Sequence, residues 1–182
     1  MFALKIDEGL ELRLLEQRHA QLLFELTVAN CEHLRPFLPW VPGLKTVSQT
    51  ESFIKLGLEQ FARNDGFQAG IFANSELVGM VGLHYIRWNS ERTEIGYWLS
   101  KNVQGRGIAT RTVRTLCDYC FDELKLGRVE IRCAPQNTRS RRVPERLGFT
   151  EEGTLRRMAR LEHGWSDWVV YGLLRDEGPR TP

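Results

Sequence analysis

The stretch Gln104-Gly105-Arg106-Gly107-Ile108-Ala109-Thr110 decides the fold of this chain. Its two glycines stand between a β-like run and the most clearly amphipathic helix of the sequence, and glycine permits positive φ and close backbone approach. The free N–H groups and the positive dipole end of that helix would face the loop. A strand, a glycine-bearing loop and a helix in this order predict a phosphate site, the alternative being a tight turn into a helix.

The loop differs from the two best-known phosphate loops. A Walker loop needs G-K-[ST], whereas Gly107 is followed by Ile108 and Ala109. A dinucleotide-binding loop needs a third glycine, and Thr110 occupies that position. The long run of strands before the loop also fits a doubly wound sheet poorly. Hydrolysis of nucleoside triphosphates and dinucleotide binding are therefore not expected.

Hydrophobic spacing outside the loop predicts a mixed α/β chain with about four helices and seven strands. Apolar residues three and four apart indicate a helix behind the loop, closed by Gly127. Three further helices are expected. One covers 18–34, one follows a Ser48/Glu51 capping box, and one covers 140–147. Alternating or short apolar runs predict the strands, at 10–14, 67–73, 77–85, 91–99, 129–133, from 149 onward and at 166–174. Asn74-Ser75-Glu76 indicates a hairpin turn.

Length and composition indicate one soluble globular domain over residues 1–182. The chain has 182 residues, 42% of them hydrophobic and 26% charged, with a formal net charge of +2. We expect a core over about 10–174 and a frayed tail at 178–182. No apolar run approaches a membrane span, and the N-terminus lacks a signal-peptide pattern. Four cysteines without ligand-like neighbours favour a reduced, cytoplasmic protein.

The charge is unevenly distributed along the chain. Residues 128–160 hold nine arginines and four acidic residues, a local net charge of +5. Arginine presents a rigid fork of donors to phosphate, so this excess favours a small anionic ligand. A solvated helix face is the alternative interpretation. The near-neutral total makes nucleic acid an unexpected partner.

The motifs together resemble the GNAT superfamily of acetyl-CoA-dependent N-acetyltransferases. Gln104-x-x-Gly107-x-Ala109 is similar to its [Q/R]-x-x-G-x-[G/A] pyrophosphate loop, and the resemblance covers about residues 10–174. Glu94-Ile95-Gly96-Tyr97-Trp98-Leu99 resembles its fourth strand, and Asn137 with Leu147-Gly148-Phe149 resembles its closing segment. The fourth-strand motif and the aromatic loop Pro36–Trp40 are similar to the RimL-like subgroup, which acetylates ribosomal-protein N-termini.

The resemblance implies a fold and a cosubstrate. The fold is a mixed, mostly antiparallel seven-stranded sheet whose fourth and fifth strands, here 91–99 and 129–133, splay apart. Acetyl-CoA would enter that gap, with no metal. The residues expected to bind it are Trp98, Leu99, Gln104, Gly105, Arg106, Gly107, Ile108, Ala109, Thr110 and Asn137. We add the hypothesis that one or more of Arg139, Arg141 and Arg142 contact the 3′-phosphate.

Acetyl transfer to an amine needs a base for the amine proton and an acid for the leaving thiolate. Glu94 matches the position of a catalytic glutamate in several family members, and the alternative is a salt bridge or an orienting role. The usual acid of the family, a tyrosine, is replaced by Pro144. The ribosomal-protein subgroup resembles this chain in having Ser at the position of Ser140, and this resemblance makes Ser140 the candidate acid. An ordinary helix N-cap is the alternative for Ser140. We expect the helix to start at Ser140, which leaves Pro144 in its first turn.

The acceptor cleft is expected between residues 34–44, 84–88 and 165–168, with Trp40, His84 and Tyr97 contacting the acceptor. By resemblance, the acceptor is the N-terminal α-amine of a ribosomal-type protein or a peptide. Acetylation of a small amine, such as an antibiotic or polyamine, and a non-catalytic acyl-CoA-binding module are the alternatives. His84 alone is more often a packed or exposed side chain than a base. Exposed aromatic residues suggest a homodimer.

Overall fold

One mixed sheet of eight strands organises the part of the chain that the computed structural model describes, residues 3–161 and 164–178. The strand order is β1-β2-β3-β4-β5-β6-β8-β7, and the β5–β6 pair is parallel. The strands are β1 Ala3–Asp7, β2 Leu10–Leu14, β3 Phe67–Ala73, β4 Glu76–Arg87, β5 Arg92–Leu99, β6 Arg128–Cys133, β7 Thr150–Leu161 and β8 Gly164–Leu174. Strand β1 adds to the seven expected strands because it pairs along β2, and Leu4 and Ile6 pack against the core.

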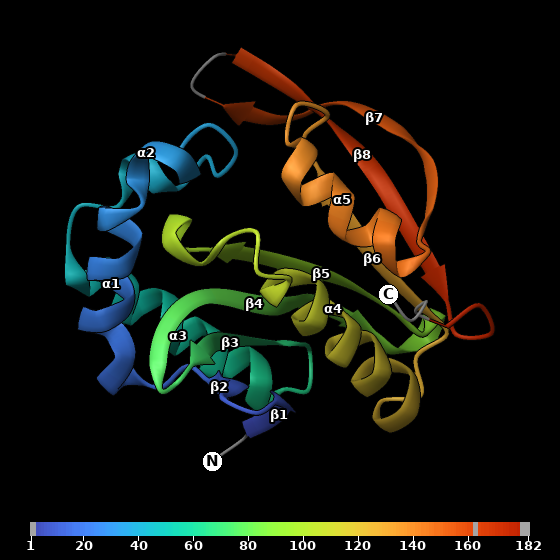
Figure 1. Cartoon of the computed structure of the whole chain (residues 1–182), viewed down its shortest axis with the longest axis horizontal. Coiled ribbons are helices and arrows are strands. Elements are labelled where there is room, and N and C mark those ends of the chain that lie inside the picture. Colours follow the sequence, from blue (N-terminus) through green and yellow to red (C-terminus); the bar gives the residue numbers. More distant parts are fainter. Residues whose placement is uncertain (1–2, 162–163, 179–182) are drawn as a thin grey trace.

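Helices cover both faces of this sheet, with α1, α2 and α3 on one side and α4 and α5 on the other (Figure 1). They are α1 Ala20–Ala29, α2 Cys31–Leu34, α3 Val47–Ala62, α4 Ile108–Asp118 and α5 Thr138–Leu147. The expected helix over 18–34 is divided at Asn30, whose backbone leaves the helical region at φ −109°. None of the helices in the described ranges has both the length and the apolarity to cross a bilayer.

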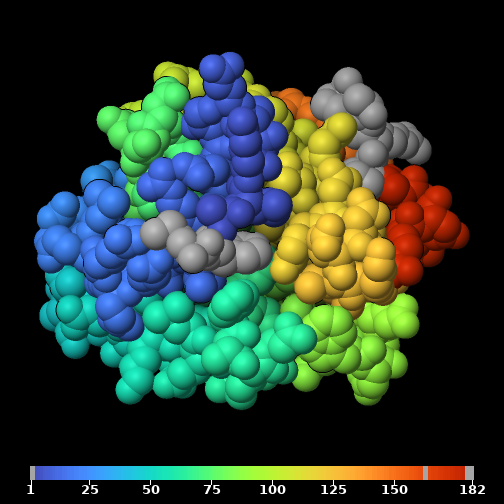
Figure 2. Space-filling model, turned by 90° about the horizontal axis from the view of Figure 1, so that it is seen from below, coloured from blue at the N-terminus to red at the C-terminus, as the bar shows by residue number. Residues whose placement is uncertain are grey.

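Each face of the sheet has its own hydrophobic core. Ile95, Leu116 and Leu147 belong to the core under α4 and α5, whereas Trp98 belongs to the core under α1 to α3. Strand β1 closes the first core at its edge, where the guanidinium of Arg111 lies 2.7 Å from Asp7. Figure 2 shows the blue N-terminal strands beside the yellow surface of α4.

The sheet opens between β5 and β6, as expected for the fourth and fifth predicted strands. The two strands pair only from Arg92↔Arg128 to Glu94↔Glu130. Beyond this point β5 continues to pair with β4 as far as Leu99, and β6 continues with β8 as far as Cys133. Residues 95–99 and 131–133 therefore present unpaired strand edges to a gap, which confirms the splay.

Helix ends were the least accurate part of the prediction. The capping box of α3 is Thr46/Gln49, two residues before the expected pair. Helix α4 ends at Asp118 and continues as a π-helical turn over Tyr119–Glu123, so Gly127 does not end it. Helix α5 begins at Thr138 because the side-chain oxygen of Asn137 accepts the Ser140 N–H at 3.2 Å and caps the helix. The predicted start at Ser140 is wrong, and Pro144 lies inside the helix.

Candidate active site

The glycine loop has the backbone geometry of an anion site. Gly105 and Gly107 have φ values of +77° and +72°, and Gly107 is the N-cap of α4. The bond from Arg111 N–H to Gly107 C=O closes the first turn, so the N–H groups of Ile108, Ala109 and Thr110 have no partner within the helix. Because a Cβ on Gly105 would meet no atom within 4 Å, the loop faces open space. These N–H groups and the helix dipole suit a diphosphate.

A groove of about 850 Å³ runs past this loop. The loop and the first turns of α4 and α5 form one wall, the end of β5 forms the floor, and the segment after α2 forms the rim. The predicted coenzyme-binding residues that line it are Trp98, Leu99, Gln104, Gly105, Gly107, Ile108, Ala109, Thr110, Asn137, Arg139 and Arg142. Arg106 does not line the groove. Sequence reasoning missed other lining residues, among them His33, Lys101, Gln136, Thr138, Val143 and Arg146.

The arginines of α5 separate into two groups. Arg139 donates to the side-chain oxygen of Gln104 at 2.7 Å, which ties α5 to the glycine loop. Arg142 and Arg146 follow on the groove side. Arg141 instead bonds the Tyr171 hydroxyl at 2.8 Å and Glu151 at 3.0 Å, so it is held away from the groove. The structure therefore removes Arg141 from the 3′-phosphate hypothesis.

Ser140 and Tyr97 face each other inside the groove. The Tyr97 hydroxyl donates to the backbone oxygen of Ser140 at 3.0 Å, and the Ser140 hydroxyl donates to the Tyr97 oxygen at 3.2 Å. Pro144 has no N–H, so it cannot make the helical bond to the Ser140 carbonyl, and Tyr97 takes its place. Burial raises the pKa of Tyr97, partly opposed by the Ser140 hydrogen bond, so the phenol stays protonated and can donate.

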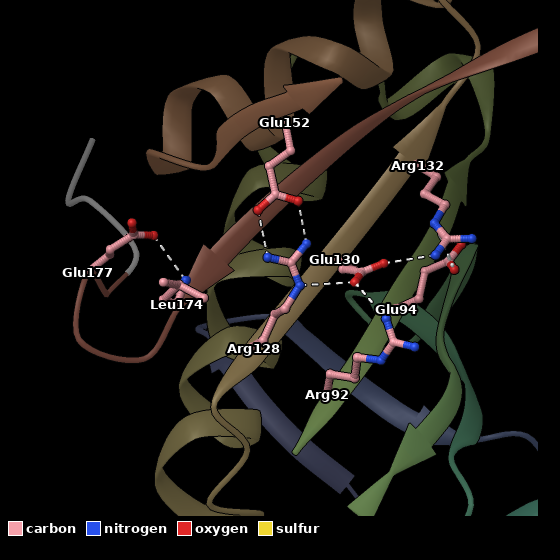
Figure 3. A network of polar contacts seen from close by, with 8 residues as sticks. All are labelled: Arg92, Glu94, Arg128, Glu130, Arg132, Glu152, Leu174 and Glu177. Carbon is pink, nitrogen blue, oxygen red and sulfur yellow. Dashed lines mark hydrogen bonds and ion pairs between the residues drawn. The ribbon is translucent and has the colours of Figure 1, made fainter. Parts of the chain in front are cut away.

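Glu94 lies on the other face of β5. Its side chain is 10% exposed, with one oxygen 3.4 Å from His84 Nδ1 and the other 3.5 Å from Arg132 Nε. Arg132 also bonds Glu130 at 2.9 Å (Figure 3). Glu94 does not line the groove at the glycine loop. The carboxylate is therefore fixed between an imidazole and a guanidinium at the point where the sheet opens.

The three expected walls of the acceptor cleft do not meet in one groove. Residues 34 and 36–38 form the rim. His84 lines a second hollow of about 420 Å³ between α3 and β4. The indole of Trp40 is exposed, as is Trp165 on the β7–β8 hairpin, and neither borders either hollow. Of the predicted acceptor contacts, only Tyr97 lies in the groove.

A loop suited to an anion beside an opening in a mixed sheet, with two hydroxyl groups in the adjoining groove, is the arrangement expected of a coenzyme A-dependent acyltransferase. Residues 9–150 match the family described as "Acetyltransferase (GNAT) domain". The chain belongs to this family, and it is an acetyl-CoA-dependent N-acetyltransferase.

Similar proteins agree with this assignment over nearly their whole length. The chain is 38% identical over 178 residues to the "Putative ribosomal N-acetyltransferase YdaF" of Bacillus subtilis, covering 97% of each chain. It is 28% identical to the ribosomal-protein-serine acetyltransferase of Escherichia coli, covering 95% of this chain and 97% of the relative. The structure of the microcin C7 self-immunity acetyltransferase MccE with acetyl-CoA and AMP matches with a TM-score of 0.89 and 25% identity, covering 93% and 94%.

Proposed function

We propose that the acceptor is the N-terminal α-amine of a protein or peptide of the ribosomal type. The observation that carries the proposal is the course of the groove, which runs from the glycine loop past the end of β5 and opens at an apolar rim of Pro36, Phe37 and Leu38. An open, apolar mouth suits a peptide whose backbone extends out of the protein. The named activities of the B. subtilis and E. coli relatives support the same acceptor class.

The residues of the groove fit coenzyme A at three places. The N–H groups over 104–110 would hold the pyrophosphate, and the unpaired edge of β5 at Trp98 and Leu99 would pair with the pantetheine arm. The Asn137 side-chain oxygen is engaged by Ser140, which leaves its amide N–H groups for the same arm. Arg139 and Arg142 are the candidates for the 3′-phosphate.

The catalytic roles divide between the two faces of β5. We propose that Ser140 donates the proton to the leaving thiolate. Its hydroxyl lies in the groove and is hydrogen-bonded to the Tyr97 phenol. Glu94, on the opposite face, is one of the residues to which we assign removal of the proton from the acceptor amine. Ribosomal proteins are synthesised in the cytoplasm, where we expect the reaction to occur.

A panel of acceptors tests this function. Peptides with a free N-terminus, the same peptides blocked at the N-terminus but carrying a free lysine, polyamines and aminoglycosides are each incubated with acetyl-CoA, and thiol release is measured. Free-N-terminus peptides should release coenzyme A and gain one acetyl group at the α-amine by fragmentation mass spectrometry. Release with small amines alone would replace the proposal by small-molecule acetylation. Binding of acetyl-CoA without release for any amine would indicate a non-catalytic module.

A further inference from the structure

We propose that His84 is the general base of the transfer reaction and that Glu94 acts through it as a positioning residue. The inference rests on the proposed function and deepens it. Three independent features of the structure carry it: a bulge in β4, a glycine beneath the imidazole, and the contacts that fix Glu94.

The bulge places His84 against Glu94. In the β4–β5 register Leu83 pairs with Ile95 and Ile86 pairs with Thr93. Two residues of β4, His84 and Tyr85, therefore stand opposite the single residue Glu94. A bulge re-aims side chains and is over-represented beside active sites. Here it brings His84 Nδ1 to 3.4 Å from Glu94 Oε1.

Gly96 allows the imidazole to lie along β5. A Cβ at Gly96 would stand 2.1 Å from His84 Nε2 and 2.4 Å from Cε1. The ring therefore extends from Glu94, at Nδ1, to a place over Gly96, at Nε2, and a larger residue at position 96 would force the imidazole to move. Side chains two apart in a strand share a face and lie about 7 Å apart. Trp98, the next residue on this face of β5, lines the groove.

Glu94 is poorly suited to accept the proton itself. Its side chain is 10% exposed and already contacts Arg132, whereas the His84 side chain is 50% exposed. The Arg132 guanidinium is in turn bonded to Glu130 on β6, as Figure 3 shows. This chain of contacts holds the carboxylate in place, and a fixed carboxylate at Nδ1 orients an imidazole.

The groups around His84 come from several elements. Gln60 of α3 donates to its backbone oxygen at 2.9 Å. Arg63, Asp65, Tyr85 and Arg87 share the hollow that it lines, Glu94 faces it from β5, and Arg132 stands behind Glu94. Among these groups only Glu94 is within ion-pair distance of the imidazole.

Consecutive residues of β5 then carry the two proton-transfer groups on opposite faces of the strand, with His84 over Gly96 and the Ser140 hydroxyl beside Tyr97. The acceptor ammonium first loses one proton to solvent, which frees the nitrogen lone pair. His84 Nε2 then takes a second N–H proton as this lone pair forms the bond to the thioester carbonyl carbon. The C–S bond breaks, and the sulfur receives a proton from Ser140, which regains one from solvent. The imidazolium releases its proton to solvent, so that amide, thiol and one proton result from each ammonium and thioester.

His84→Gln tests the base with a preferred peptide acceptor. The variant should lose roughly 100-fold in kcat/KM for the peptide, a typical contribution of a general base. Its dissociation constant for acetyl-CoA, measured by calorimetry, should stay within about twofold because His84 does not contact the glycine loop. Exogenous imidazole should restore activity to His84→Ala, which leaves space for the ring. His19→Gln removes an imidazole that lines neither the groove nor the hollow at His84, and its kcat/KM should match that of the wild type.

The pH profile distinguishes His84 from Glu94. A protonated base cannot accept a proton, so wild-type log kcat/KM should show a bend below which it falls one unit per pH unit more steeply. His84→Gln should lose the bend. Glu94→Gln should keep the bend but lower kcat/KM, because the imidazole loses the carboxylate that orients it.

Two results would overturn the inference. A full-length, folded His84→Gln enzyme with wild-type kcat/KM and an unchanged bend would exclude His84 as the base while leaving acetyl transfer intact. A bend that disappears in Glu94→Gln but persists in His84→Gln would make Glu94 the direct base. If the wild type acetylates none of the peptides or amines, the proposed function fails first and this inference fails with it.

Discussion

Ser140 and Asn137 share the first turn of α5 but have separable roles. The Asn137 side chain caps the helix by accepting the Ser140 N–H, whereas the Ser140 hydroxyl is bonded to Tyr97 in the groove. Asn137→Ala should therefore lower the free energy of unfolding by about 1 kcal/mol, the usual effect of losing an N-cap. Ser140→Ala should lower it by less, yet reduce kcat roughly 100-fold.

Urea unfolding and steady-state kinetics of the two variants measure these effects. The same stability loss in both variants, with kcat falling only in proportion to the unfolded fraction, would assign Ser140 a structural role. Tyr97→Phe is the useful companion, because it removes the hydroxyl behind Ser140 without touching the cap.

Arg142 and its neighbour Arg141 provide a matched pair for the 3′-phosphate. Arg142→Gln should raise KM for acetyl-CoA about tenfold, since a hydrogen bond to a charged group contributes about 1.5–3 kcal/mol. With acetyl-dephospho-CoA the same variant should match the wild type. Arg141→Gln should leave both KM values unchanged and lower stability instead, because its bonds to Tyr171 and Glu151 are lost. Equal effects of Arg142→Gln on both thioesters would exclude the contact.

Part of this residue-level division was available in the sequence. Arg139, Arg142 and Arg146 recur at spacings of three and four, which places them on one side of a helix, and the structure puts all three on the groove. Arg141 falls outside that spacing. Arg146 was missed because the hypothesis considered only the arginines nearest Asn137. His33, on α2, and Lys101, two residues after β5, reach the groove through the tertiary arrangement of the elements, which no spacing indicates.

At the scale of elements, Pro144 in α5 and Tyr97 in β5 form one unit. The missing Pro144 N–H leaves the Ser140 carbonyl free, and the Tyr97 hydroxyl bonds it. Tyr97→Phe should therefore destabilise the wild type by roughly 1–3 kcal/mol, the effect of a buried polar group left without a partner. In a Pro144→Ala background the new N–H of residue 144 can bond the Ser140 carbonyl. The loss in free energy of unfolding caused by Tyr97→Phe should therefore be at least about 1 kcal/mol smaller.

A double-mutant cycle by urea unfolding measures this coupling. Strictly additive effects would show that the proline and the tyrosine act independently. Val143→Ala supplies a control background, since it alters the same buried turn of α5 without creating an N–H donor.

Elements with strong local signals were predicted well, whereas those set by tertiary contacts were not. Asn74 and Ser75 both adopt positive φ, as the hairpin prediction for that turn requires. The bulge at His84 had no such signal, because its two residues read as part of an ordinary alternating strand. The sequence predicts Pro144 in the first turn of the helix because proline disfavours helix interiors. In the structure Pro144 lies in the helix interior, which is tolerated because Tyr97 supplies the missing hydrogen-bond donor.

For the whole molecule, the arginine excess over 128–160 serves two purposes. Some of these arginines line the groove, in agreement with an anionic ligand. Others neutralise carboxylates at the junction of β5, β6 and β7, where Arg128 pairs with both Glu130 and Glu152 (Figure 3). The sequence shows the local excess of arginine. Which of these arginines form ion pairs within the protein depends on the pairing of strands that are distant in sequence. The junction fixes the closed end of the gap.

This junction predicts how stability depends on pH. Burial acts to raise the pKa of Glu130, but the hydrogen bonds from Arg128 and Arg132 outweigh it and hold the pKa below its ordinary value of 4.5. A lowered folded-state pKa contributes stability above the ordinary value, and that stability is lost as the pH falls through the folded pKa. Glu130→Gln should therefore be less stable at pH 7, by roughly 1–2 kcal/mol, because Arg128 and Arg132 lose a charged hydrogen-bond partner although they keep Glu152 and Glu94.

The difference between wild type and Glu130→Gln should shrink as the pH falls below 4.5, since the wild-type carboxylate then becomes neutral as well. Urea unfolding of both proteins from pH 7 to pH 3 measures this difference in the free energy of unfolding. Glu59→Gln, at an exposed position on α3, controls for removal of one negative charge and should track the wild type throughout. A stability difference of constant size over the whole pH range would mean that packing at residue 130 stabilises the closed end of the sheet opening, and not the charge that Arg92, Arg128 and Arg132 surround.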